Sequence, residues 1–227
     1  MRAAPFALAA LCGCGTLSGA RPLAPGHHEV GVSLGGPLLA FGGAGVPTPN
    51  VVVGARSGVT EIGGRPLDVG YGTNLTGLPF GIVSAYGDVG YLLVEQRGAV
   101  PAVAVRNKLL LTTNLVAAGR DPELAPRTAW AADQVDVLAS WEVGGSGTLV
   151  YGAVGQVFDF ADPGLILAPA LGADIDFGAP GGVRLQPELR WWAVNEAFEQ
   201  RNIPWLPGSP GALGVHVGLV APIGGGR

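Results

Sequence analysis

Apolar and polar residues alternate along most of this chain, in short runs separated by Gly, Pro and Asp. The last run sets Leu213, Val215, Val217 and Leu219 against Gly214, His216 and Gly218. A repeat of two residues places one set of side chains on each face of a β-strand, whereas a helix needs a repeat of about 3.6. Because such runs recur about ten times between turn residues, the sequence predicts an all-β domain of about ten antiparallel strands.

The stretches between the predicted strands alternate in length. Residues 144–147 and 179–182 are short Gly-rich turns, whereas 116–129 and 196–210 are long loops that contain proline. Short turns at one end and long loops at the other predict a single up-and-down β-barrel. Over residues 28–223 the chain resembles small bacterial outer-membrane β-barrels. It departs from them after Ile223, where Gly-Gly-Gly-Arg stands in place of the usual terminal aromatic residue.

A soluble β-sandwich or a lipocalin-like barrel would show the same alternation. The architectures differ in which face is buried, because a soluble domain packs its apolar face inside and a membrane barrel turns that face to lipid. Aromatic residues fall near both predicted ends. Those at the long-loop end are Trp130, Phe160, Trp191 and Trp192, and those at the short-turn end are Trp141, Tyr151 and Phe177. Aromatic belts of this kind are typical of membrane barrels.

Composition narrows the classes of partner. The chain is 48% hydrophobic with a formal net charge of −4, and it has no run of eighteen apolar residues that could form a membrane-spanning helix. Gly and Pro are abundant, at 39 and 19 residues, but the apolar alternation argues against disorder. Because no basic stripe is present, nucleic acid is not expected as a partner.

The first twenty residues have the order of a secretory signal. Arg2 precedes an apolar run over 3–11 that is too short to span a bilayer, and Leu-Cys-Gly-Cys follows at 11–14. Leu-x-Gly-Cys resembles the bacterial lipobox, which implies that Cys14 is acylated, becomes the mature N-terminus and binds outer-membrane lipid. A cut after Ser-Gly-Ala at 18–20 is the alternative, because small residues stand at −3 and −1 there.

The expected organisation has four parts. A lipoprotein signal peptide covers 1–13, a lipidated linker 14–27, the barrel domain 28–223 and a short tail 224–227. Gly15 follows the acylated cysteine. Since Asp at this position marks inner-membrane retention in the lipoproteins that the chain resembles, the outer membrane is the expected location.

The polar face of the predicted strands carries charges of both signs. Inside a closed barrel, an unpaired charge would cost several kcal/mol. We therefore predict an interior polar network formed by Arg56, Asp68, Arg106, Asp136, Glu142, Glu188, Arg190 and His216. Arg190 and Glu188 are two residues apart and share a face. The expected cross-strand partner of Arg190 is Asp174 or Asp176 on the preceding strand, or His216 on the following one. A charged lumen that admits a solute is the alternative interpretation.

Glycine recurs on the same polar face. The inward positions are Gly31, Gly35, Gly54, Gly70, Gly72, Gly172, Gly214 and Gly218. Glycines there either permit tight curvature of the wall or leave space unfilled. The first interpretation predicts a narrow barrel, and the second predicts a small pocket or pore.

No catalytic, cofactor-binding or metal-binding motif stands out. His216 with Ser140 and Glu142 is a conceivable set for a lipid-modifying enzyme, but a lone inward histidine is more often structural. His27 and His28 provide two ligands only, and Asp174 with Asp176 lacks the spacing of a calcium loop. The sequence therefore predicts no enzyme activity, no cofactor and no metal.

The long loop near the C-terminus is the candidate contact surface. Trp192, Phe198 and Trp205 lie in or beside it, and exposed aromatic side chains often serve recognition. They would bind an envelope protein, or else fold down to cap the barrel. The expected function is that of a structural or interaction lipoprotein of the outer membrane. A small-solute channel or ligand-binding barrel and a lipid-modifying enzyme are the alternatives.

Overall fold

The structure, a computed structural model, describes residues 17, 19–41, 44–47, 49–120, 129–160, 166–177, 182–195 and 211–224. Its strands are β1 (His28–Phe41), β2 (Ala44–Pro47), β3 (Asn50–Ile62), β4 (Arg65–Asn74), β5 (Ile82–Val94), β6 (Ala102–Asn114), β7 (Ala129–Glu142), β8 (Leu149–Asp159), β9 (Ile166–Leu167), β10 (Ala170–Asp176), β11 (Arg184–Trp192) and β12 (Ala212–Ile223). Two short helical segments, η1 (Leu78–Phe80) and α2 (Leu115–Arg120), follow β4 and β6. The sequence predicted a loop over 116–129, and the structure shows that this connection begins as helix α2.

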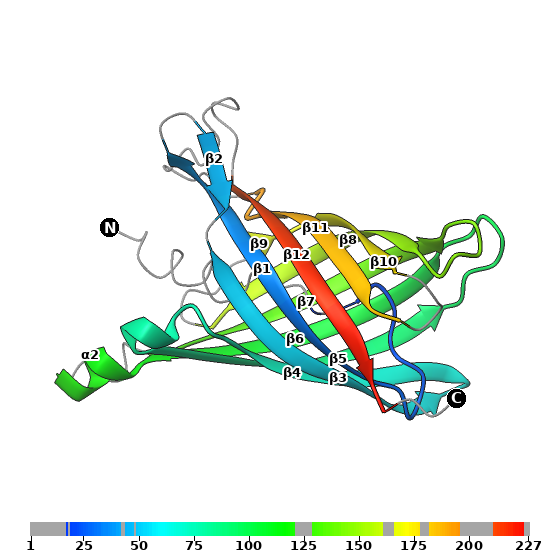
Figure 1. Cartoon of the computed structure of the whole chain (residues 1–227), viewed down its shortest axis with the longest axis horizontal. Coiled ribbons are helices and arrows are strands. Elements are labelled where there is room, and N and C mark those ends of the chain that lie inside the picture. Colours follow the sequence, from blue (N-terminus) through cyan, green and yellow to red (C-terminus); the bar gives the residue numbers. More distant parts are fainter. Residues whose placement is uncertain are drawn as a thin grey trace.

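Ten strands close into one antiparallel barrel (Figure 1). Each strand of the ring pairs with the next, and the ring closes where β1 pairs with β12, with His28 opposite Ile223 and Pro37 opposite Gly214. The short β9 pairs with the end of β8, ahead of β10, and β2 folds back on the end of β1. The predicted single up-and-down, all-β barrel of about ten strands is confirmed.

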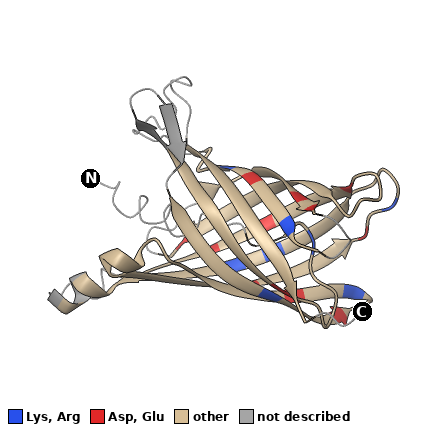
Figure 2. Ribbon diagram, viewed as in Figure 1, with Lys and Arg blue, Asp and Glu red and all other residues tan. Residues whose placement is uncertain are grey.

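The barrel is polar inside and apolar outside. Its buried charged side chains on the ring strands include Glu29, Arg56, Asp68, Asp88, Arg106, Lys108, Asp136, Asp174, Glu188 and Arg190. Large apolar side chains at the intervening positions point outward, and Val154 and Leu171 are 64% and 68% exposed. Because side chains alternate along a strand, the sequence pattern places charges in the lumen and aliphatic groups on the outer surface. Figure 2 shows the charged residues along the barrel strands and at one rim.

The two ends of the barrel differ in their connections. At the short-turn end, Gly63 and Gly64 alone join β3 to β4, and both have positive φ, which glycine adopts without strain. The loop end carries the longer connections 75–81, 115–128 and 193–211. β1 begins and β12 ends at the short-turn end, where the C-terminus lies (Figure 1). Within the described residues, no helix is long and apolar enough to cross a bilayer.

Candidate functional site

Ion pairs line the lumen near the short-turn end. The Arg106 guanidinium contacts Asp88 and also Asp68, with 3.0 Å between Nη2 and Oδ1. Arg56 binds the same Asp68, at 2.5 Å from Nη2 to Oδ2. Asp68 on β4 therefore holds two arginines, from β3 and β6, and its side chain has no exposed surface. A buried carboxylate in this position is stabilised because both of its oxygens accept charged hydrogen bonds.

The same chain of charges continues around the wall. Arg56 lies 3.8 Å from Glu29 on β1, and Glu29 also contacts Arg184 on β11. Arg184 Nη1 lies 3.1 Å from Asp174 Oδ2 on β10, and Gln186 donates to the same oxygen at 3.1 Å. Acids and arginines thus alternate from β5 and β6 around to β10, through β4, β3, β1 and β11.

A second cluster joins β11 to β7 along the inner wall, over Gly155 of the intervening β8. Arg190 on β11 binds Asp136 on β7, at 2.8 Å from Nη1 to Oδ1, and its Nε lies 2.9 Å from Glu188 Oε1. Tyr151 donates from its hydroxyl to Glu188 Oε2 at 2.8 Å, and Gln134 donates to Asp136 Oδ2 at 2.7 Å. Because β7 and β11 are not neighbours in the ring, this cluster ties two separated parts of the wall together.

The structure corrects the predicted partners of Arg190. Asp174 pairs with Arg184 instead. In the register of β10 and β11, Asp176 lies opposite Arg184, so this end of β10 lies six residues along β11 from Arg190. His216 does not join the network, since neither of its ring nitrogens has a hydrogen-bond partner.

Of the eight residues predicted for the interior network, seven are buried in the lumen: Arg56, Asp68, Arg106, Asp136, Glu188, Arg190 and His216. Glu142 is the exception. It is the last residue of β7, where the chain leaves the barrel for a turn, and it is exposed. Four contributors that the sequence analysis did not include in the network are Glu29, Asp88, Arg184 and Tyr151, and all occupy inward positions of the alternation.

Part of the described chain before β1 lies inside the barrel. We call residues 17 and 19–27 the inner segment. Leu17, 4% exposed, packs with Val52 and Val220 on one wall, whereas Ala20, 1% exposed, packs with Leu138 among the residues of the opposite wall. Contacts with both walls place the start of the inner segment in the lumen, whereas residues 24–27 are exposed at the short-turn rim. The inner segment belongs to the stretch that the sequence suggested as a linker, and it joins β1 at the short-turn end (Figure 1).

Hydrogen bonds fix the backbone of the inner segment to the ion-pair chain. The Leu23 amide donates to Asp68 Oδ2 at 3.0 Å, and Arg56 Nη2 donates to the Arg21 carbonyl at 2.9 Å. The Arg21 side chain donates from Nε to Ser140 Oγ at 3.0 Å. Burial lowers the pKa of the Arg21 guanidinium from its ordinary value, and the charge of Glu142 opposes that shift. The inner segment is therefore an integral part of the lumen.

Glycines on the inner wall make room for these groups. Gly31, Gly54 and Gly72 are successive partners across β1, β3 and β4. A Cβ on Gly31 would lie 2.7 Å from Leu17 Cδ2, and one on Gly72 would lie 2.5 Å from a ring carbon of Tyr86. The glycine row therefore leaves space that the inner segment and one aromatic ring fill.

The candidate catalytic set is not assembled. Ser140 accepts a hydrogen bond from Arg21, Glu142 is exposed, and neither nitrogen of His216 has a hydrogen-bond partner. His28 Nδ1 lies 2.9 Å from Ser57 Oγ at the rim. Among the described residues, no group of three or more His, Cys, Asp or Glu side chains could hold a metal ion.

The candidate contact loop is described only at its start. Trp192 is partly buried and packs against an apolar cluster that contains Ala132, Val157 and Ile166, and its ring lies 5.4 Å from the Arg190 guanidinium carbon. For Trp192 alone, this packing agrees with the interpretation that the aromatic side chains of the loop fold down to cap the barrel. Phe198, Trp205 and the predicted lipidation site Cys14 lie outside the described residues.

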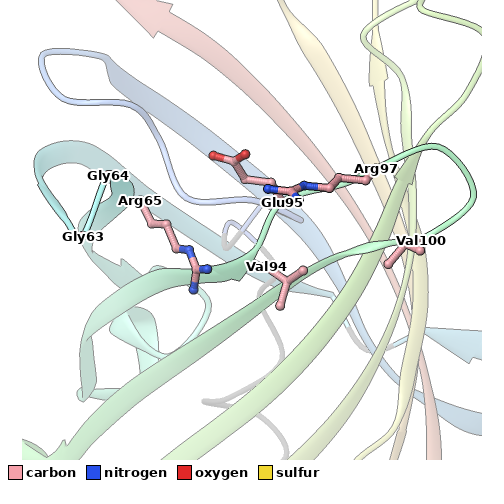
Figure 3. Close-up of a pocket in the computed structure, with 7 residues that line it drawn as sticks. All are labelled: Gly63, Gly64, Arg65, Val94, Glu95, Arg97 and Val100. Carbon is pink, nitrogen blue, oxygen red and sulfur yellow. The ribbon is translucent and has the colours of Figure 1, made fainter.

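A shallow hollow of about 470 Å³ lies at the short-turn end, between the β3–β4 and β5–β6 turns (Figure 3). Its lining includes Arg65, Glu95 and Arg97, together with glycine and valine residues. The Arg65 guanidinium donates to the Leu93 carbonyl. These charged side chains are exposed, so the hollow has no desolvated polar group that would select a ligand.

In a comparison with known proteins, no protein-family model and no curated protein matches the chain.

Proposed function

We propose that this protein is a bilayer-embedded β-barrel lipoprotein of the bacterial outer membrane with a structural or interaction role and no enzyme activity. The inverted polarity of the barrel carries the proposal. Charges fill the lumen, and aliphatic side chains cover the outside, where water would surround them in a soluble protein. An outer surface of this kind matches lipid, and a soluble barrel would have the opposite arrangement.

Strand length supports the same proposal. β5 and β6 each have 13 residues, and β12 has 12. A strand of 12 residues extends about 40 Å, and a tilt of about 40° leaves about 30 Å along the barrel axis, which is the thickness of a bilayer core. Exposed aromatic side chains also lie near both rims, with Phe158 and Phe160 at the loop end and Trp141 and Phe177 at the short-turn end.

The ion pairs and the inner segment in the lumen support a structural or interaction role over a channel. Arg190 bridges two separated strands, and Arg56 and Asp68 bind the inner segment as well as each other. A conducting pore would need these groups to part. Planar-bilayer recording of the intact protein tests this point, with no conductance expected, and stable single-channel steps would favour the small-solute channel instead.

The inner segment also supports processing at Cys14. Leu17 and Ala20 are buried contacts of the lumen, and a cut after Ala20 would remove both. Processing at Cys14 retains them. Metabolic labelling with an acyl-chain probe should mark the wild type and miss Cys14→Ser, whereas an unlipidated chain that begins at Arg21 would contradict this part of the proposal.

Extraction tests the embedding itself. The Cys14→Ser variant lacks the proposed lipid anchor, so a tethered soluble domain would be released by a carbonate wash. An embedded barrel would stay in the membrane fraction until detergent is added. Release of Cys14→Ser without detergent would therefore contradict the proposal.

A further inference from the structure

An apolar tip projects from the loop end of the barrel. It consists of η1 with the first two residues of α2, namely Leu78, Phe80, Leu115 and Val116, and we call these residues the apolar tip. The Leu115 amide donates to the Gly81 carbonyl at 2.9 Å, and Val116 packs against Gly81. Figure 1 shows η1 and α2 together, beyond the end of the ring. The end of the β4–β5 hairpin and the start of the β6–β7 connection therefore contact each other and do not form two independent loops.

The apolar tip is exposed and uncharged. Phe80 is 70% exposed and Leu115 58% exposed, and the other two members are also exposed. Residues 69–87 contain no Asp, Glu, Lys or Arg, so the β4–β5 hairpin lacks charge from the barrel wall to its end. In the β6–β7 hairpin residues 109–119 are also uncharged, and charges begin with Arg120 at the end of α2 and continue with Asp121, Glu123 and Arg127. The short-turn rim differs, since Arg65, Glu95 and Arg97 lie there. Large apolar side chains gathered on a projection are uncommon on a water-exposed surface.

The apolar tip continues the outer surface of the barrel. Leu109 and Leu111 face outward on β6, and both are exposed. Leu115 follows them in the same chain after two threonines and Asn114, and it is exposed in turn. The apolar surface on this side of the barrel therefore extends past the end of the strands and onto η1 and α2.

We propose that the apolar tip inserts into the lipid interface of the membrane leaflet at the loop end, so that lipid covers Phe80 and Leu115. The proposal rests on the embedding of the barrel, because continuity with a lipid-facing surface is what selects lipid over another occupant. Apolar side chains at the boundary of a bilayer gain from burial among acyl chains, and a charged residue beside them, such as Arg120 at the end of α2, can stay at the level of the headgroups. A protein partner or a second copy of the chain would be the other occupants.

Spin-label accessibility tests the apolar tip separately from the barrel. The full chain carrying Cys12→Ser and Cys14→Ser is reconstituted in phosphatidylcholine vesicles, with one nitroxide attached at Phe80→Cys, Leu171→Cys or Ser146→Cys. Leu171 is on the outer wall, and Ser146 is exposed in the β7–β8 turn. Collision rates with oxygen, which partitions into lipid, and with a water-soluble nickel chelate are then compared.

We expect the ratio of oxygen to nickel collisions at position 80 to exceed that at 146 severalfold and to lie below that at 171, because Phe80 lies at the lipid interface and Leu171 lies deeper. A water-like ratio at 80 with a lipid-like ratio at 171 would overturn the proposal for the apolar tip and leave the embedding intact. Water-like ratios at both positions would overturn both. Spin–spin broadening at 80 that disappears on dilution with unlabelled protein would assign the apolar tip to a second copy and also overturn the proposal.

Discussion

Arg190 on β11 reaches along the inner wall, over Gly155 of β8, to Asp136 on β7, with 2.8 Å between Nη1 and Oδ1. Both side chains are buried, and the same guanidinium also binds Glu188. The register of neighbouring strands brings Ala170, and no acid, opposite Arg190, so the partner comes from a strand that is not its neighbour. This contact neutralises two buried charges and ties β11 to β7 across the two strands between them.

Arg190→Ala should lower the free energy of unfolding by about 3–5 kcal/mol, because it leaves the carboxylates of Asp136 and Glu188 buried without their cation. Urea unfolding in detergent measures the loss. Arg97→Ala, at an exposed position of the short-turn rim, is the matched control and should change stability little. Adding Asp136→Ala to Arg190→Ala should restore part of the loss. Equal stabilities for Arg190→Ala and the wild type would contradict a structural network.

The Leu23 amide should exchange slowly with solvent, because it donates to the buried Asp68 carboxylate. Asp68→Ala removes this acceptor and should speed the exchange. The Gly26 amide, which bonds to the Gly58 carbonyl at the rim, provides a reference within the same segment. Hydrogen exchange followed by NMR or mass spectrometry reads both sites. Exchange of Leu23 at the rate of an unfolded chain in the wild type would show a free linker and contradict the inner segment.

Gly70→Ala should destabilise the barrel by about 1–3 kcal/mol, which is typical of overpacking. A Cβ on Gly70 would lie 2.6 Å from Asp88 Oδ2 and would push that carboxylate off Arg106. Gly152→Ala is the matched control, since its Cβ would meet Leu171 at an ordinary 3.5 Å. Thermal unfolding of both variants compares them directly. A loss no larger for Gly70→Ala than for Gly152→Ala would contradict the filling of glycine space by charged side chains.

The alternation of the sequence was sufficient to predict which side chains share a face. Val30 and Val32 are exposed and Glu29 and Ser33 are buried, because a period of two needs only local geometry. The alternation does not determine which face is inside, since a lipocalin-like barrel has the same pattern. The closed ring of the structure determines it, because the ring buries the polar side chains in the lumen.

Specific pairings could not be predicted from the sequence. Arg190 meets Asp136 because the ring has ten strands and a particular stagger, and neither is encoded near those residues. The inner segment was missed for another reason. Its small and apolar residues have no periodicity, and its partners are the glycines of β1 and β3. The inward glycines were a signal for it, since a row of positions without side chains must be filled from elsewhere.

The stability of an outward-facing arginine in lipid tests the embedding most directly. Leu171 and Phe177 are 68% and 54% exposed, but Leu171 lies within β10 on the outer wall and Phe177 follows its end at the short-turn rim. In phosphatidylcholine vesicles, Leu171→Arg should cost about 2–4 kcal/mol and Phe177→Arg about 0–1 kcal/mol, because the penalty for a charge depends on its depth in the bilayer. In a soluble barrel, both positions would face water. A cost near zero for Leu171→Arg, equal to that for Phe177→Arg, would contradict the account of a bilayer-embedded barrel.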